Sequence, residues 1–332
     1  MFLLEQKNMK YGFLLIILLG CFKTNSQTCC SGGVPLSNNL GLPNEGKNSW
    51  IFGLNYDYNN LNTLKSGTER LEDNSRLRIT NSILLNTSYS FTDKFSAELL
   101  LTWVNQTRTI RQFGNENFTE TSGIGDAVLL FKYAIQNILG ENTLLNLGIG
   151  TKVPLGKSDL ISKQGIQLTA DLQPGSGAFD GIGWLSLSKK LKSKPSALIF
   201  GNLSYRLTGV NDSYLNNTST YEFGNELQVN LGYSDQFLLY KTLFSPKLTF
   251  KYRRALRDKI NNNYLPNTGG EWVFVRPELS SEITSNIALN SKIELPIYSY
   301  VDGTQLSPTL RLTVGFTYKL NKKKTSTRFI KF

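Results

Sequence analysis

The sequence predicts an all-β fold, a transmembrane antiparallel up-and-down β-barrel of about twelve strands spanning residues 48–320. Apolar and polar side chains alternate along many segments, no segment beyond the N-terminal region is long and apolar enough for a spanning helix, and long and short connections follow one another. Because only helices and closed barrels satisfy every backbone hydrogen bond in lipid, these features together favour a barrel.

The clearest alternation lies near the end of the chain, over residues 309–320. Apolar or aromatic residues occupy every even position from Leu310 to Leu320, and polar or small residues occupy the odd positions from Arg311 to Lys319. Since a strand sends successive side chains to opposite faces, this segment has one apolar and one polar face. About twelve residues at ~3.3 Å each can cross a bilayer at a tilt. To close a barrel, this strand must pair with the first one, Trp50–Tyr58.

Further strands are predicted between these two. They cover residues 77–91, 95–103, 127–135, 145–153, 177–189, 197–207, 221–233, 248–252, 272–280 and 287–297. The segments 177–189 and 272–280 are strand-like but irregular in their alternation. Long loops are expected at 61–75, 107–122, 154–176, 209–219, 257–270 and 298–308, and shorter turns between the other strands, with 234–245 unusually long for a turn. Long connections at one rim and short ones at the other are typical of bacterial outer-membrane barrels, and both termini would then be periplasmic.

A soluble β-sandwich or lipocalin-like barrel is the main alternative, because those folds also alternate. Three features argue against it. The predicted strands run to about ten to fourteen residues, whereas soluble strands usually have about five or six. Aromatic residues gather at strand ends, where a membrane interface would place them: Trp50, Tyr56, Tyr58, Tyr89, Phe91, Tyr133 and Tyr318. Finally, ionisable residues occupy the polar face in mid-strand, where a filled apolar core would not tolerate them.

These mid-strand charges are the candidate selectivity residues of a water-filled lumen. They are Glu98, Asp126, Lys132, Lys152, Arg206, Glu222, Glu226, Lys251, Lys292, Glu294 and Arg311, with Arg253 beside them. Facing acidic and basic arcs would create a transverse field that decides which solutes pass. Mutual neutralisation in a crowded lumen is the alternative, and both interpretations can hold for different pairs.

The N-terminal region has the pattern of a secretory signal. Lys7 and Lys10 precede an apolar run over residues 11–20, and small residues lead to a cleavage site after Ser26. Residues 1–26 are therefore expected to be a signal peptide, a reading that we favour over lipidation at Cys21. The protein would then be exported to the outer membrane of a Gram-negative bacterium.

Residues 27–47 are expected to form a periplasmic leader or a plug in the lumen, and residues 321–332 a basic tail. Cys29 and Cys30 lie in this leader. Adjacent cysteines rarely bond each other, so pairing with other chains or no pairing is favoured over a soft-metal or thiol-exchange role.

Composition excludes several function classes. The chain of 332 residues has a formal net charge of +11, but its charges are scattered along strands, which favours contact with anionic lipid or anionic solutes over nucleic acid. It contains no histidine and no G-x-S-x-G motif, so an enzyme is not expected. No metal or cofactor is expected either.

The segment 154–176 joins two strands that end at prolines, Pro154 and Pro174. A mobile surface loop is the favoured interpretation, and a constriction folded into the barrel mouth is the alternative. A barrel of about twelve strands falls between filled eight-stranded barrels and open sixteen-stranded ones, so a narrow lumen is expected.

Two sets of residues resemble known proteins. The run Thr313-Val-Gly-Phe-Thr-Tyr-Lys-Leu320 resembles the terminal-strand signal read by the barrel assembly machinery, although the chain continues beyond it. Gly123-Ile-Gly-Asp126, Gly150-Thr-Lys-Val-Pro-Leu-Gly156 and Leu172-Gln-Pro-Gly-Ser-Gly177 resemble the outer-membrane transporter family linked to the meta-pathway of phenol degradation, in a Bacteroidota-like form. This resemblance implies a channel for small organic solutes, aromatic or anionic ones among them. A structural or adhesive barrel that displays surface loops without transport is the alternative.

Overall fold

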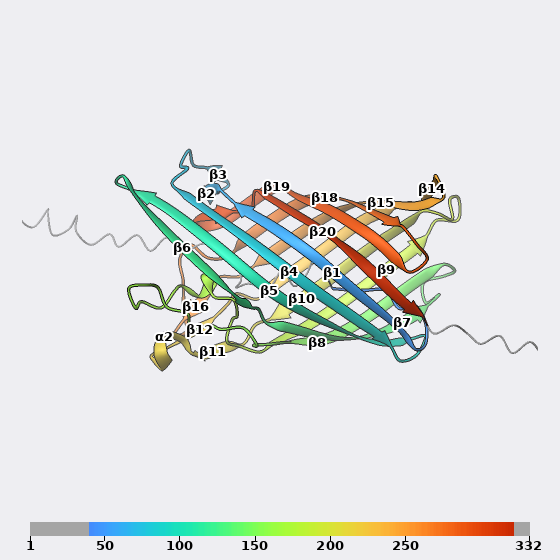
Figure 1. Cartoon of the computed structure of the whole chain (residues 1–332), viewed down its shortest axis with the longest axis horizontal. Coiled ribbons are helices and arrows are strands. Elements are labelled where there is room, and N and C mark those ends of the chain that lie inside the picture. The colour runs from blue at the N-terminus through green and yellow to red at the C-terminus, as the bar shows by residue number, and fades with distance from the viewer. Residues whose placement is uncertain (1–39, 322–332) are drawn as a thin grey trace, which may run out of the picture.

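The computed structural model describes residues 40–321 and confirms a closed barrel of twelve antiparallel strands (Figure 1). The wall consists of β1 (Ser49–Leu61), β4 (Arg76–Ser90), β5 (Phe95–Gln112), β7 (Ala127–Gln136), β8 (Thr143–Val153), β9 (Asp180–Lys190), β10 (Leu198–Leu207), β13 (Glu226–Ser234), β15 (Thr242–Ala255), β18 (Gly270–Glu282), β19 (Ile287–Ser307) and β20 (Leu310–Asn321). Each of these strands pairs with its neighbours in chain order. The predicted signal peptide, most of the leader with its two cysteines, and the basic tail after Asn321 lie outside the described residues.

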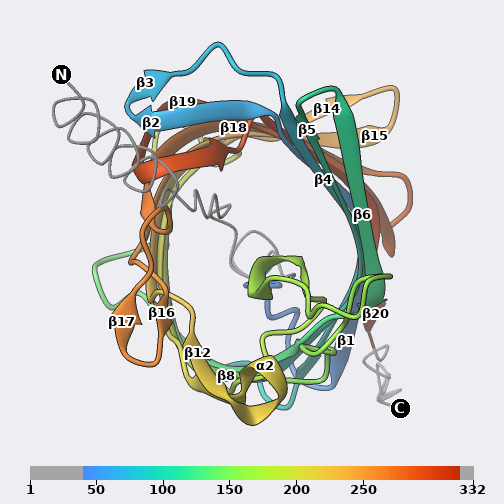
Figure 2. The same ribbon diagram turned by 90° about the vertical axis from the view of Figure 1, so that its left-hand side faces the viewer.

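The barrel closes where the sequence requires it to close. Strands β1 and β20 pair antiparallel, with Trp50 opposite Leu320 and Tyr58 opposite Leu312. Figure 2, which looks along the barrel, shows the resulting ring of strands. Closure leaves the wall without an unpaired edge, as a barrel in lipid requires.

The outer surface of the wall is apolar and carries an aromatic belt. Outward-facing Ile83 and Trp103 are each about half exposed, at 50% and 49%. Near the rim with the short turns, aromatic rings follow one another from strand to strand: Trp50 lies 4.6 Å from Tyr89, and Tyr89 lies 4.8 Å from Phe91. Amphipathic rings gather in this way at a membrane interface. Among residues 40–321, no helix is both long and apolar enough to cross a membrane.

At the opposite rim, several predicted loops are continuations of strands. Strand β5 forms a long hairpin with β6 (Asn115–Ile124), and β19 bends at a register shift and then pairs with β2 (Thr63–Gly67), which is followed by β3 (Glu69–Arg70). The predictions of loops at 107–122 and 298–308 are therefore wrong. At the short-turn rim, β14 (Phe237–Leu239) extends β15 as a hairpin, which explains the length of the segment 234–245.

A small outer sheet stands beyond the long-loop rim. It contains β11 (Val210–Ser213), β12 (Ser219–Glu222), β16 (Lys259–Ile260) and β17 (Asn263–Tyr264), with α2 (Tyr214–Asn217) between the first two. The predicted strand 221–233 is in fact split, because the chain leaves the sheet between β12 and β13 at Gly224. A Cβ on Gly224 would lie only 1.8 Å from the carbonyl oxygen of Leu256, so this crossing needs glycine.

Candidate functional site: the barrel lumen

A ladder of six charges with alternating sign lines one side of the lumen. The members are Asp126 just before β7, Lys152 on β8, Asp180 on β9, Arg206 on β10, Glu226 on β13 and Arg253 on β15. Ion pairs connect them in order, at 3.4 Å for Lys152–Asp126, 2.8 Å for Lys152–Asp180, 3.4 Å for Arg206–Asp180, 3.5 Å for Arg206–Glu226 and 2.8 Å for Arg253–Glu226. Inward-facing residues on neighbouring strands lie side by side, so each charged side chain reaches the one on the next strand. Three cations and three anions leave no net charge here.

The segment between β8 and β9 folds into the lumen, so the expectation of a surface loop is wrong. It includes the short helix η2 (Ala170–Leu172), and Figure 2 shows this light green segment inside the ring of strands. The buried side chain of Arg78 on β4 pairs with Asp171 at 2.8 Å. The Ser176 hydroxyl donates to Asp126 at 2.7 Å. These bonds hold the segment against β4 and the start of β7, on the two sides of β5.

Glycine makes the close fit of this segment possible. A Cβ on Gly175 would lie 2.3 Å from the carbonyl oxygen of Gly156, and one on Gly156 would lie 2.7 Å from Gly175. The two backbones therefore touch without side chains between them. The Gly-Ser-Gly and Pro-Leu-Gly patterns in the sequence mark this contact.

A second segment, Leu40–Lys47, lies in the lumen near the short-turn rim. The backbone nitrogens of Gly41 and Leu42 donate to the buried carboxylate of Glu98 on β5, at 3.1 and 3.0 Å. Lys132 on β7 pairs with the same carboxylate at 2.6 Å and also donates to the carbonyl oxygen of Leu42. Gly41 has φ of +94°, and a Cβ there would lie 2.6 Å from the Trp184 ring. Only glycine fits between this ring and this carboxylate.

Leu40 also packs on an apolar cluster inside the barrel that sequence reasoning missed. The cluster consists of Leu84, Leu100, Val128, Leu130 and Ile182. These residues lie on the face that was expected to be polar throughout. The signal was present in the sequence, because runs such as Ile83-Leu-Leu85 and Leu99-Leu-Leu101 place apolar side chains on both faces of a strand.

A second charged cluster lies on β15, β18 and β19, and we call it the basic cluster. It comprises Lys247, Lys251, Arg276, Lys292, Glu278 and Glu294. The pairs Lys247–Glu278, Arg276–Glu278 and Lys251–Glu294 measure 3.1, 2.7 and 3.1 Å, and Arg276 lies 3.8 Å from Glu294. Four cations face two anions, so this cluster has a formal charge of +2.

The predicted site residues thus separate into distinct groups. Glu98 and Lys132 hold Leu40–Lys47; Asp126, Lys152, Arg206, Glu226 and Arg253 belong to the ladder; Lys251, Lys292 and Glu294 belong to the basic cluster; and Arg311 pairs with Asp57 at 2.9 Å. Glu222 differs: it lies on β12 in the outer sheet, beyond the barrel wall, and pairs with Lys259 at 3.1 Å. Its placement follows from the split of the strand predicted at 221–233.

Sequence reasoning missed the lumen charges Asp57, Asp180, Lys247, Arg276 and Glu278. The irregular alternation of 177–189 and 272–280 hid three of them. In the second segment, Trp272 and Phe274 share the inward face with Arg276 and Glu278, while Val273 and Val275 lie on the other face. Apolar side chains on both faces conceal which face is polar.

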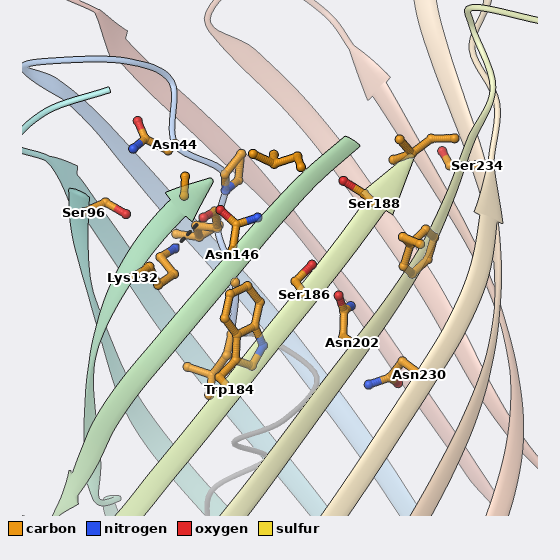
Figure 3. A pocket seen from close by; sticks show the side chains of 18 of the residues that line it. Asn44, Ser96, Lys132, Asn146, Trp184, Ser186, Ser188, Asn202, Asn230 and Ser234 are labelled. Carbon is orange, nitrogen blue, oxygen red and sulfur yellow. Dashed lines mark hydrogen bonds between the residues drawn. The ribbon is translucent and has the colours of Figure 1, made fainter. Parts of the chain in front are cut away.

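Two cavities flank the segment Leu40–Pro43. One has a volume of about 430 Å³ and the other about 330 Å³, and both are lined by Leu40–Pro43, Lys247 and Glu278. Figure 3 shows the larger cavity, with Asn146, Ser186 and Asn202 projecting into it from three neighbouring strands. Within residues 40–321, no three His, Cys, Asp or Glu side chains are arranged to hold a metal ion.

One strongly perturbed group lies in the outer sheet region. Burial raises the pKa of Asp258 to about 6. Its carboxylate nevertheless accepts hydrogen bonds from the Tyr221 hydroxyl at 2.7 Å and the Gly224 backbone nitrogen at 2.8 Å. Loss of contact with water outweighs these bonds.

Comparison with solved structures identifies the same barrel architecture elsewhere. An outer-membrane channel from Pseudomonas putida F1 superposes with a TM-score of 0.65 at 15% identity, covering 86% of this chain and 100% of that chain. The transport unit of the autotransporter AIDA-I from Escherichia coli gives a TM-score of 0.47 at 10% identity, covering 84% and 92%. The CymD monoaromatic hydrocarbon channel gives a TM-score of 0.40 at 8% identity, covering 83% of this chain and 90% of that chain.

No protein-family model matches the sequence, and no curated protein matches it.

Proposed function

We propose that this chain is an outer-membrane channel for small solutes, with a lumen narrowed by two segments of its own chain. The observation that carries the proposal is a closed barrel that is apolar outside and has charged, hydrogen-bonding cavities of about 430 and 330 Å³ inside. A barrel built only for structure gains nothing from buried charges, which are costly to remove from water. Charged side chains that line a lumen instead control which solutes enter.

The proposed location in the outer membrane is supported by the surface of the same barrel. The aromatic belt around Trp50 and Tyr89 suits a membrane interface, and the closed seam between β1 and β20 suits insertion into lipid. We further propose that residues 1–26 direct export and that the barrel assembly machinery reads the terminal strand β20. The relation to the meta-pathway transporter family is part of this proposal.

The two inner segments would act as gates at different depths. Leu40–Lys47 is held by Glu98 and Lys132, and the segment between β8 and β9 is held by Arg78 and Asp126. Each is attached by side-chain hydrogen bonds and packing to a wall whose strand pairing is complete without it. Release of either segment leaves the barrel hydrogen bonds unchanged and widens the path.

The test is conductance and solute flux with the purified full chain. In planar bilayers we expect discrete current steps, and in liposomes we expect uptake of small polar solutes. Removal of residues 40–47 together with all residues before them should raise the mean conductance. Absence of current and of flux from both the full chain and the shortened chain, with the barrel folded, would refute the channel.

A display function is the second candidate, favoured by the ordered outer sheet. Tyr214, Tyr221 and Phe223 pack together there with Ala170 of the inward segment, so this region has a small core of its own. Such a surface could present β16 and β17 to a partner outside the cell. A folded barrel that conducts in neither form, yet binds cells or matrix through this sheet, would support display over transport.

A further inference from the structure

We propose that the two cavities form a binding site for small anionic solutes rich in hydroxyl groups, such as sugar acids. This inference rests on the proposed channel function and names its substrate class. Charge is distributed unevenly among the groups that line the lumen. The ladder is neutral, and the pairs Lys132–Glu98 and Arg311–Asp57 are neutral as well. Of these charged groups, only the basic cluster carries a surplus.

The surplus positive charge of the basic cluster lies at the walls of the two cavities, where a solute would contact it. Lys247 and Arg276 line the larger cavity, and Lys247 and Lys292 line the smaller one. Glu278 is the one acidic member of the basic cluster that lines either cavity, because Glu294 pairs with Lys251 away from them. Lys132 and Asp93 also line the larger cavity, so four cations and two anions line the two cavities together. The surplus of two positive charges favours one or two negative charges on the solute.

The part of the larger cavity's wall between β8 and β13, next to β15, is neutral and carries hydrogen-bonding side chains beside the rings of Trp184 and Phe200. Asn146, Asn202 and Asn230 project from β8, β10 and β13, and Ser186 and Ser188 project from β9 between them (Figure 3). Amides and hydroxyls both donate and accept, as hydroxyl groups on a solute also do. This wall therefore complements a solute with several hydroxyls.

One buried hydrogen-bond acceptor in this wall favours a solute with hydroxyl groups. Asn230 is only 5% exposed, and its Oδ1 has no hydrogen-bond partner among the described residues. A buried acceptor without a donor is unfavourable, and a solute hydroxyl would satisfy it. An apolar aromatic solute would leave it unsatisfied, together with the amides around it.

The test measures binding separately from passage. The folded full chain in detergent is titrated with gluconate, with glucose as a neutral analogue and with benzoate as an anion without hydroxyls. We expect gluconate to bind at least about tenfold more tightly than either, the difference that one charge-assisted hydrogen bond typically makes. The substitution Lys247→Gln should remove about tenfold of that affinity. Lys192→Gln, at a turn with a 75% exposed side chain, is the matched control and should have no effect.

The outcomes separate the two proposals. Gluconate binding without flux would support the site and contradict the channel. Flux without preference for gluconate over glucose and benzoate would support the channel and overturn the site. Equal effects of Lys247→Gln and Lys192→Gln would also overturn the site, and heat-modifiable migration on gels confirms that each variant barrel is folded.

Discussion

Replacing Glu98 with glutamine should release the segment Leu40–Lys47 from the lumen. Both carboxylate oxygens of Glu98 face donors: the backbone nitrogens of Gly41 and Leu42 and the ammonium of Lys132. The substitution keeps the side-chain volume but turns one acceptor into an N–H group that faces these donors. The segment then loses its main polar attachment, while the wall strands keep their backbone pairing.

The expected magnitude follows from the bonds that are lost. A hydrogen bond to a charged group contributes about 1.5–3 kcal/mol, and two backbone nitrogens donate to this carboxylate. A loss of about 3 kcal/mol raises the population of the released segment roughly 150-fold. Backbone amide exchange at Gly41 and Leu42 should accelerate by a similar factor, and the channel should spend more time in its higher conductance state.

Two comparisons make the test specific. Gly41→Ala keeps the carboxylate but places a methyl group against Trp184, so it should release the same segment by steric conflict. Glu141→Gln removes the same charge at a turn where the side chain is 81% exposed, and it should change neither exchange nor conductance. If Glu98→Gln and Gly41→Ala both fold and both retain native exchange and conductance, the segment is not held as described.

Three further predictions follow from other parts of the chain. Asp171→Asn leaves Arg78 buried without its carboxylate, at a cost of about 3–5 kcal/mol, so trypsin should cut the detached segment between β8 and β9. The pKa of Asp258 is about 6 in the folded protein and ordinarily 3.8, so the outer sheet should be most stable below pH 4. Its free energy of unfolding should fall by about 3 kcal/mol as the pH rises past 6, measured by hydrogen exchange corrected for intrinsic rates. Gly315→Val places a side chain 2.3 Å from the carbonyl oxygen of Leu54, so less protein should reach the heat-modifiable folded form.

Each prediction has a matched control and a contrary result. Asp159→Asn changes an exposed residue of the same segment and should leave trypsin resistance intact; equal cleavage of both variants would contradict the role of Arg78. Asp258→Asn should abolish the pH dependence of the outer sheet's stability, whereas Asp212→Asn changes an exposed residue of that sheet and should keep it. A pH dependence that persists in Asp258→Asn and disappears in Asp212→Asn would contradict the role of Asp258. Gly183→Val adds a side chain that meets nothing within 4 Å, so a loss of folding equal to that of Gly315→Val would point away from the seam.

Much of the barrel could be predicted from the sequence because alternation is a local property. The pattern in 309–320 required one face to differ from the other, and twelve such segments required closure, which the pairing of Trp50 with Leu320 confirms. Boundaries were predicted less well where strands continue past the wall, as β19 does to Ser307, because the hydrophobic pattern ends at the membrane while the hydrogen-bonded ladder continues.

The site depended on contacts that no local pattern contains. Polar residues such as Glu98 and Asp126 could be assigned to one face of a strand. Their partners, however, are the backbone nitrogens of Gly41 and Leu42 and the hydroxyl of Ser176. Ion pairs between strands depend on register, and the apolar rings of Trp272 and Phe274 on the inward face of β18 hid Arg276 and Glu278 on that same face.

The sequence by itself determined a closed barrel with an apolar exterior and a charged interior, because side-chain period and strand length leave few other ways to satisfy the backbone. Only the tertiary structure decided what fills that interior. Both inner segments are ordinary polar stretches when read alone, and their positions follow from glycines that permit close approach and from buried charges that need partners. Those requirements exist only once strands far apart in the chain face each other across the lumen.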